Sequence, residues 1–195
     1  MNIFERAKSI IVTPKTEWVV IENENTTSQQ LLTKYLLLLA LIPAIASFIG
    51  YSFVGISLGK LGHIGGGVGF GLRQAIIAYA SSIISTYLAA WVINFLAASF
   101  SSEKNFDKAF QLVVYAYTPT MIAGVFLIFP ALSVIQLIAG LYGLYILYLG
   151  LHPMMRTPED KKPIYFVVSL LVMIVVSFAI SSIFAAIFVT THMWR

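Results

Sequence analysis

The sequence contains no cysteine and few charged residues. The absence of cysteine excludes disulfides, thiol catalysis and metal or iron–sulfur sites that need thiolate ligands. Only 10% of the 195 residues are charged, whereas a soluble domain carries about 25%. Hydrophobic residues make up 59% of the chain, and the mean hydropathy is +0.89. This composition leaves too few charged groups to cover a water-facing surface, so it predicts an integral membrane protein.

Five apolar stretches are long enough to form membrane-spanning helices, each of which needs about 20 apolar residues. They cover residues 31–53, 74–100, 109–129, 131–151 and 164–190. The pattern predicts an all-α, polytopic integral membrane protein whose five transmembrane helices form one bundle. Residues 1–30 form a cytoplasmic tail that contains no signal-peptide core and should be retained, and residues 191–195 form an outer tail.

None of the five stretches contains aspartate or glutamate. Acidic side chains at membrane depth mark proton relays and ion paths, because they are costly to bury in lipid. Their absence argues against a proton-coupled transporter.

The N-terminal tail has the pattern of two short interfacial helices. Apolar residues share one face of a helix over residues 2–12, namely Ile3, Phe4, Ala7, Ile10 and Ile11. This helix is too short to span, so we expect it to lie flat on the membrane with Phe4 and Ile11 facing lipid. Thr13-Pro14 predicts the start of a second helix. Thr27 and Gln30 predict a capping box for the first span.

The distribution of lysine and arginine predicts the orientation. With the N-terminus inside, nine of the 12 basic residues lie on the inner side, and Lys60, Arg73 and Arg195 lie outside. All eight acidic residues also fall on the inner side. We therefore expect a cytoplasmic N-terminus and an outer C-terminus, most simply in the inner (plasma) membrane of a bacterium.

Basic and aromatic residues on the predicted inner side are candidates for contact with lipid headgroups or partner proteins. They are Arg6, Lys8, Lys15, Trp18, Lys104, Lys108, Arg156, Lys161 and Lys162. Each basic residue near an anionic surface contributes about 1 kcal/mol, and tryptophan is a common interfacial anchor.

The third span contains a polar face and a proline. Pro119 removes an N–H from the helix and predicts a kink. Gln111, Tyr115 and Thr118 share a face that should turn inward with Pro119 and line any cavity, whereas Tyr117 should pack against a neighbouring helix. The alternative is a purely structural kink without a ligand.

Other motifs carry little chemistry. Residues 55–59 match the G-x-S-x-G pattern of serine hydrolases, but no acidic residue lies on that side. The glycines from 62 to 71 fit no phosphate-binding motif and predict a loop or close helix packing. His63, His152 and His192 are divided between the two sides, so no metal site is expected. We predict no catalytic residue, no cofactor and no nucleic-acid partner.

Three segments together resemble the bacterial branch of the Yip family, the Ypt/Rab-interacting membrane proteins. They are Ile11 to Ile21, Asn105 to Phe110 leading into Tyr115-Ala-Tyr-Thr-Pro119, and Gly140 to Leu151. The resemblance implies five spans, a cytoplasmic N-terminus and no catalytic residues. In eukaryotic relatives it implies interaction with Rab-type GTPases, but their signature Asp-Leu-Tyr-Gly-Pro is absent here. A Rab-type partner is therefore not expected.

Two functional classes follow from these observations. The first is a non-enzymatic, Yip-like protein that binds or organises membrane lipids, other membrane proteins or further copies of itself. The alternative is a small transporter, channel or lipid-translocating protein with a cavity near the third span. An intramembrane enzyme ranks third. A cavity in the bundle would favour the alternative, and a tightly packed bundle with a basic inner face would favour the first class.

Overall fold

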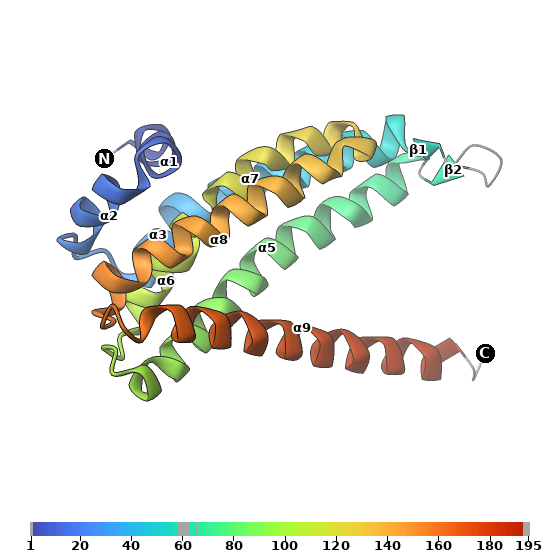
Figure 1. Ribbon diagram of the computed structural model, residues 1–195. Coiled ribbons are helices and arrows are strands. Elements are labelled where there is room, and N and C mark those ends of the chain that lie inside the picture. Colours follow the sequence, from blue (N-terminus) through green and yellow to red (C-terminus); the bar gives the residue numbers. More distant parts are fainter. Residues whose placement is uncertain (1, 58–62, 65, 193–195) are drawn as a thin grey trace.

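The computed structural model describes residues 2–57, 63–64 and 66–192, without the side chains of residues 56–57, 63–64 and 179–192. Four helical segments in this part are long and apolar enough to cross a membrane: Ser28–Val54, Val68–Phe100, Phe106–Ile128 and Pro130–Met155. A further helix, α9 (Lys162–His192), has 31 residues. The chain is therefore an all-α polytopic membrane bundle (Figure 1).

The first segment is a chain of short helical pieces. It comprises α3 (Ser28–Leu31), a π-helical turn (Leu32–Leu36), α4 (Leu37–Ile49) and a second π-helical turn (Gly50–Val54). Thr27 Oγ1 accepts a hydrogen bond from the Gln30 backbone N–H at 3.3 Å, and Gln30 Oε1 accepts one from the Thr27 backbone N–H at 3.4 Å. These two bonds confirm the predicted capping box, which satisfies two backbone donors where the helix begins.

A short strand pair joins the first segment to the second. Strands β1 (Ile56–Ser57) and β2 (His63–Ile64) are antiparallel, and α5 (Val68–Leu96) continues into a 3-10 turn (Ala97–Phe100). A Cβ atom at Gly71 would lie 2.6 Å from the Phe48 carbonyl oxygen. This glycine therefore provides the close helix packing that the glycine-rich stretch predicted.

The third segment is interrupted just before its proline. Helix α6 (Phe106–Ala116) ends before Tyr117, and α7 (Thr118–Ala123) continues into a 3-10 turn (Gly124–Ile128). Pro119 lies in the first turn of α7, where its missing N–H costs little. The helix is thus divided at Tyr117, two residues before the proline at which a kink was predicted.

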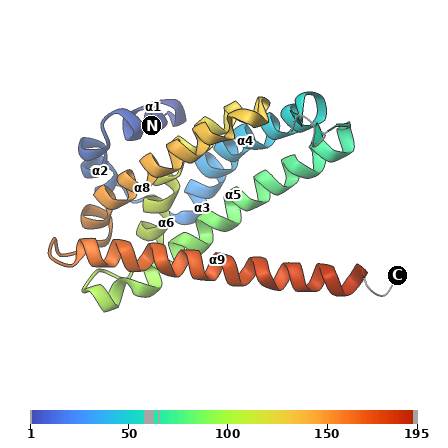
Figure 2. The ribbon, with the colours of Figure 1, turned by 45° about the vertical axis from the view of Figure 1, so that its right-hand side comes forward.

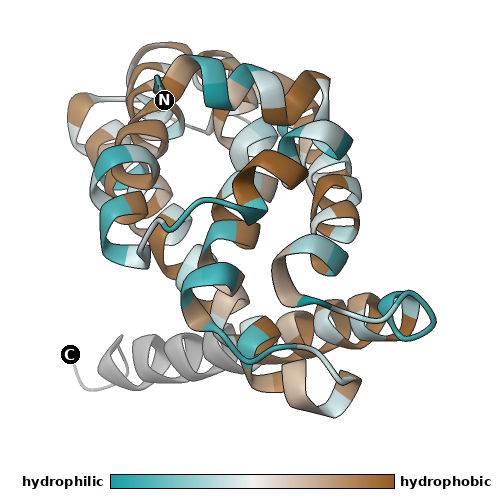
Figure 3. Ribbon diagram, turned by 90° about the vertical axis from the view of Figure 1, so that its left-hand side faces the viewer, coloured by the Kyte–Doolittle hydropathy of each residue, from teal (hydrophilic) through white to brown (hydrophobic). Residues whose placement is uncertain are grey.

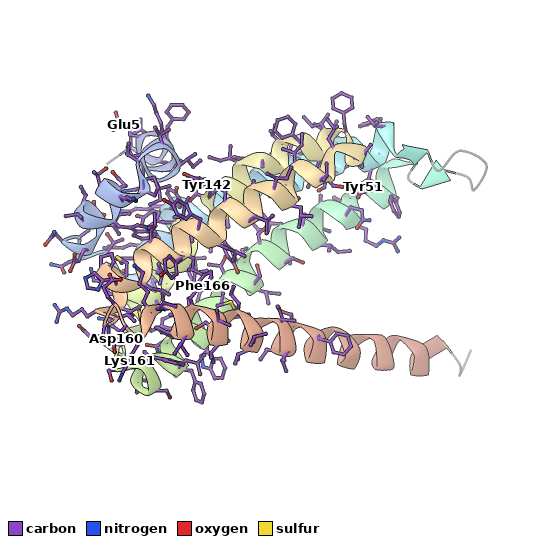
Figure 4. The ribbon with its side chains drawn as sticks, viewed as in Figure 1. Glu5, Tyr51, Tyr142, Asp160, Lys161 and Phe166 are labelled. Atoms are coloured by element: carbon purple, nitrogen blue, oxygen red, sulfur yellow. The ribbon has the colours of Figure 1, made fainter. Side chains whose placement is uncertain are left out.

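Helix α8 (Ser133–Met155) follows a 3-10 turn (Pro130–Leu132) and leads to α9. Helix α9 packs against α8 where it begins, with the Phe166 and Tyr148 ring centroids 5.4 Å apart (Figure 4). Farther along, α9 separates from α5 and α8, as two views show (Figures 1 and 2).

Two short helices, α1 (Ile3–Val12) and α2 (Pro14–Glu22), cover one end of the bundle (Figure 1). We call these two helices the cap and this end the cap end. The β1–β2 pair lies at the opposite end, and so does the end of α9 (Figures 1 and 2). The cap therefore lies at one end of the bundle, and α9 runs from that end to the other.

Most helices begin before the apolar stretches from which they were predicted. Helix α5 begins at residue 68 and α6 at residue 106, compared with predicted starts at 74 and 109. The Asn105 side chain accepts a hydrogen bond from the Lys108 backbone N–H at 3.2 Å and caps α6. The first turn of α6 contains Asp107 and Lys108 and is helical without being apolar, so hydropathy alone does not detect it.

Candidate functional site

Arg6 points from α1 into the bundle. Its side chain forms ion pairs with Glu17 of α2 and with Glu24, and only 3% of the residue is exposed. The guanidinium carbon lies 5.5 Å from the centre of the Tyr115 ring. The structure thus corrects the predicted headgroup contact of Arg6, because the two carboxylates offset the cost of burying its charge.

Trp18 of α2 is also an internal residue rather than an interfacial anchor. It is 1% exposed, and its indole N–H donates to the Ile146 carbonyl oxygen of α8 at 3.1 Å. A Cβ atom at Gly150 would lie 2.6 Å from the Trp18 ring, so this glycine leaves the space that the indole occupies. The prediction of an interfacial Trp18 is wrong, because a slot on α8 buries the ring and satisfies its N–H.

Hydrogen bonds join the connection between α2 and α3 to α6. The Lys108 ammonium donates to the carbonyl oxygens of Glu22 at 2.6 Å and Glu24 at 3.1 Å. Asp107 accepts a hydrogen bond from the Ser28 backbone N–H at 2.8 Å, and the Gln111 amide donates to the Thr26 carbonyl. Lys108 therefore holds the tail in place instead of facing headgroups freely.

Helix α8 also holds the cap through Tyr142. Its hydroxyl donates to the Ile11 carbonyl oxygen at 2.6 Å (Figure 4). The cap is consequently fixed to both α6 and α8 by side chains that bond to its backbone. This arrangement brings together the three segments that carry the family resemblance, because Trp18, Tyr115 and Gly150 meet beneath α2.

The polar face of the third segment points into the bundle, as predicted. Gln111, Tyr115 and Thr118 are each at most 4% exposed. The Thr118 and Tyr35 hydroxyl oxygens lie 3.0 Å apart, and the Tyr35 and Tyr115 rings meet edge to face. This face is well packed, apart from the Gln111 Oε1 atom, which has no hydrogen-bond partner among the described residues.

A small cavity of about 280 Å³ lies between the cap and the first segment. Its lining residues come from the tail, the first segment and α6: Ile3, Arg6, Glu24, Thr26, Gln30, Leu31, Lys34, Tyr35 and Tyr115. Among the predicted cavity residues, only Tyr115 lines it. Gln111, Thr118 and Pro119 are instead buried between helices. The Gln111 amide donates to the Thr26 carbonyl oxygen, and the Thr118 hydroxyl donates to the Val114 carbonyl oxygen.

A larger cavity of about 560 Å³ lies among α4, α5, α7 and α8. Its lining residues are Pro43, Ser82, Ser85, Tyr117, Thr120, Met121, Ser133, Gln136, Leu137, Gly140, Leu141 and Leu144. Tyr117, predicted to pack against a neighbouring helix, thus lines this cavity on the other side of the segment. The sequence signal was the spacing of Ser133, Gln136 and Gly140, which share one face of α8.

The two connecting loops at the cap end are bonded to each other. Arg156 pairs with Glu103 at 3.1 Å, and the Lys161 ammonium donates to the Ser101 hydroxyl at 2.6 Å. Hydrophilic segments gather at this end of the molecule (Figure 3). Glu5, Asp160 and Lys161 lie there, whereas Tyr51 lies at the opposite end (Figure 4).

Some of the predicted headgroup contacts are internal and others lie on the surface. Lys162 is 8% exposed and stacks over the Tyr148 ring at 4.7 Å, so it is largely internal. Lys8, Lys15 and Lys104 are exposed and form no ion pair within the described residues. These three lysines remain open to a headgroup or a partner.

The remaining candidate motifs lie partly among side chains that the structure describes and partly outside them. His152 is exposed, and its Nδ1 atom lies 2.8 Å from the Thr157 carbonyl oxygen. The described residues include no group of three or more histidine, aspartate or glutamate side chains placed to hold a metal. The side chains of Ser57, His63 and His192 lie outside the described ones.

Comparison with known proteins identifies a family model and two relatives that match this chain. The model of the Yip1 domain matches residues 8–181. The inner membrane protein YohC of Escherichia coli strain K12 is 25% identical over 151 residues, which cover 76% of this chain and 77% of YohC. YohC of Escherichia coli O6:H1 strain CFT073 matches with the same identity and coverage. No solved structure matches the chain significantly.

Proposed function

The chain belongs to the Yip1 domain family, and on that premise we propose that it is a non-enzymatic membrane protein that binds membrane components at its cap end, above all anionic lipid headgroups. The observation that carries this proposal is the outer surface of the cap. There, exposed apolar side chains stand beside exposed lysines on helices that are fixed to the bundle.

The outer surface of the cap has the composition of a membrane-interface helix pair. Phe4 is 75% exposed and Val12 is 66% exposed, with Lys8 and Lys15 exposed beside them. Apolar side chains of such helices enter the headgroup boundary while the lysines meet lipid phosphates. Because Arg6 and Trp18 anchor the inner side, the outer side is presented without a large ordering cost.

We further propose that the cap end faces the cytoplasm of a bacterium. Nine of the 12 basic residues belong to this end, which is the bias expected of the cytoplasmic side. The YohC relatives are inner membrane proteins by name, and this chain is proposed to occupy the same membrane. The helices then cross it five times and leave α9 ending outside.

Lipid retention tests the cap surface. Purified full-length protein is exchanged into nanodiscs of mixed phosphatidylglycerol and phosphatidylcholine, and the lipids retained after extraction are counted by native mass spectrometry. The double variant Lys8→Glu/Lys15→Glu should retain several-fold less phosphatidylglycerol, because each lysine contributes about 1 kcal/mol near an anionic surface. Arg73→Glu, at the opposite end, is the matched control. Equal retention by both variants would reject the proposal.

The absence of cysteine offers a clean test of orientation. Single cysteines are introduced at position 8 and position 73 and treated in intact cells with a membrane-impermeant maleimide. We expect labelling at position 73 alone, and labelling at position 8 in intact cells would reverse the topology.

The larger cavity favours a second candidate function, that of a transporter or lipid-translocating protein. Its volume of about 560 Å³ lies within the range of about 300–1,000 Å³ that is typical of ligand sites. Reconstituted protein that moves a fluorescent lipid between leaflets faster than protein-free vesicles would support this function. An unchanged rate would leave the cavity as a binding site only.

A further inference from the structure

The larger cavity extends along about half of the membrane thickness. On α8 its lining runs from Ser133 to Leu144, a rise of about 16 Å at 1.5 Å per residue. The hydrocarbon core of a bilayer is about 30 Å thick. Ser133 begins α8 at the end away from the cap, so the cavity occupies the half of α8 that lies away from the cap, a length comparable with one leaflet.

One wall of the cavity is apolar and the facing walls carry uncharged polar groups. Leu137, Leu141 and Leu144 form a row along α8, and no lysine, arginine, aspartate or glutamate is among the lining residues of the described structure. A charged ligand group at this depth would have no counter-charge, which makes its burial costly. The lining therefore selects for an uncharged molecule with a long apolar part.

The polar groups differ in whether they are already satisfied. The Ser82 hydroxyl donates to the Ala78 carbonyl oxygen at 2.8 Å, and the Gln136 amide donates to the Thr120 carbonyl oxygen at 3.3 Å. The Tyr117 hydroxyl has no hydrogen-bond partner within the described part of the chain. The Thr120 and Ser133 hydroxyls of the lining also have no partner within that part. A hydroxyl at membrane depth without a partner costs free energy, so an incoming oxygen atom would be received by these three groups, of which Tyr117 is the aromatic one.

We propose that this cavity binds an uncharged single-chain lipid that bears a hydroxyl or carbonyl group. The lipid oxygen hydrogen-bonds to the Tyr117 hydroxyl, and the chain lies along the leucine row of α8. Gly140 keeps the middle of this path open, because a Cβ atom there would meet only the Thr120 Oγ1 atom, at 3.7 Å. The site is separate from the cap surface and does not depend on the function proposed for that surface.

Photolabelling of the full-length protein in detergent tests the site, with a diazirine-bearing hexadecanol as the probe and unlabelled hexadecanol as the competitor. Wild-type protein should be labelled on α5, α7 and α8. Gly140→Leu, which fills the path, should reduce labelling roughly tenfold. Tyr117→Phe should reduce it roughly threefold, as expected for the loss of one hydrogen bond. Ile138→Phe is the matched control, because Ile138 is on the same helix but is 61% exposed outside the cavity.

Two results would overturn the proposal. One is labelling of both Gly140→Leu and Tyr117→Phe at the wild-type level. The other is equal labelling of the same helices by a diazirine phosphatidylglycerol, which would mean that surrounding bilayer lipid accounts for the signal. Tyr117→Phe preserves side-chain volume and keeps the test decisive if Gly140→Leu fails to fold. Lys8→Glu/Lys15→Glu should label as wild type, which separates this site from the cap surface.

Discussion

The two ends of the bundle are held together by different interactions. At the cap end, ion pairs and side-chain hydrogen bonds join the cap, the connecting loops and α6, as with Arg6 and Lys108. At the opposite end, helices approach through glycines, such as Gly124 against Pro43. The ion pairs of the described residues all lie at the cap end. Ion pairs are therefore concentrated at the cap end, whereas close backbone packing at glycines also joins the helices away from it.

The third segment shows the same contrast within one helix pair. Residues 109–116 of α6 are all buried, whereas the cavity lies beside α7, beyond the break at Tyr117. The interruption before Pro119 thus separates a closely packed half of the segment from a half that borders the larger cavity. This difference predicts that substitutions in the packed half cost more stability than substitutions near the cavity.

The largest effect is expected at Trp18. Trp18→Ala removes a fully buried indole and its hydrogen bond to Ile146, so it should lower the free energy of unfolding by about 3–5 kcal/mol. Unfolding by SDS titration in mixed micelles measures this change. Val19→Ala is the control, because Val19 is 58% exposed, and it should change stability by less than about 0.5 kcal/mol. Similar losses for both variants would mean that the cap is not docked.

The next largest effect is expected at Arg6. Arg6→Met leaves the Glu17 and Glu24 carboxylates without their partner and should cost about 2–3 kcal/mol. This is less than the about 3–5 kcal/mol of a fully buried pair, since the Glu24 side chain is 32% exposed. Adding Glu17→Gln should recover part of the loss in the same titration. If the double variant is less stable than Arg6→Met, repulsion between the carboxylates is not the cause.

A smaller effect on stability should distinguish Gly124 from Gly140, two glycines in the half of the bundle away from the cap. Gly124→Ala places a Cβ atom 2.6 Å from the Pro43 Cβ and should cost about 1–3 kcal/mol through overpacking. Gly140→Ala, whose Cβ meets nothing closer than 3.7 Å, should stay within about 0.5 kcal/mol of the wild type. Thermal unfolding in detergent compares the two, and equal melting temperatures would contradict the assigned packing.

The smallest effect is expected for the loop pair of Arg156 and Glu103, whose side chains are 77% and 45% exposed. Arg156→Gln should reduce stability by at most about 1 kcal/mol, because solvent and salt screen such a pair. The loss of stability should also be smaller at high salt than at low salt. A loss as large as that of Arg6→Met would show that the loops, rather than the buried cluster, fix the cap end.

Apolar runs predicted the helices and a capping signal predicted the start of the first segment, because both depend on residues close together in the sequence. The same reasoning misplaced Arg6 and Trp18. Their positions on short amphipathic helices resemble those of surface residues, and nothing nearby in the sequence reveals Gly150 or the two carboxylates that receive them. The candidate site was therefore predicted only in part.

The sequence by itself determined the membrane class, the helical segments and the inward-facing polar side of α6, since composition and helical periodicity act locally. Only the tertiary structure decided that the cap docks onto α6 and α8 and that the larger cavity borders Tyr117 instead of Gln111. Both outcomes depend on how α8 lies against helices distant in the sequence. Its glycines admit the Trp18 ring at Gly150 and leave open space at Gly140.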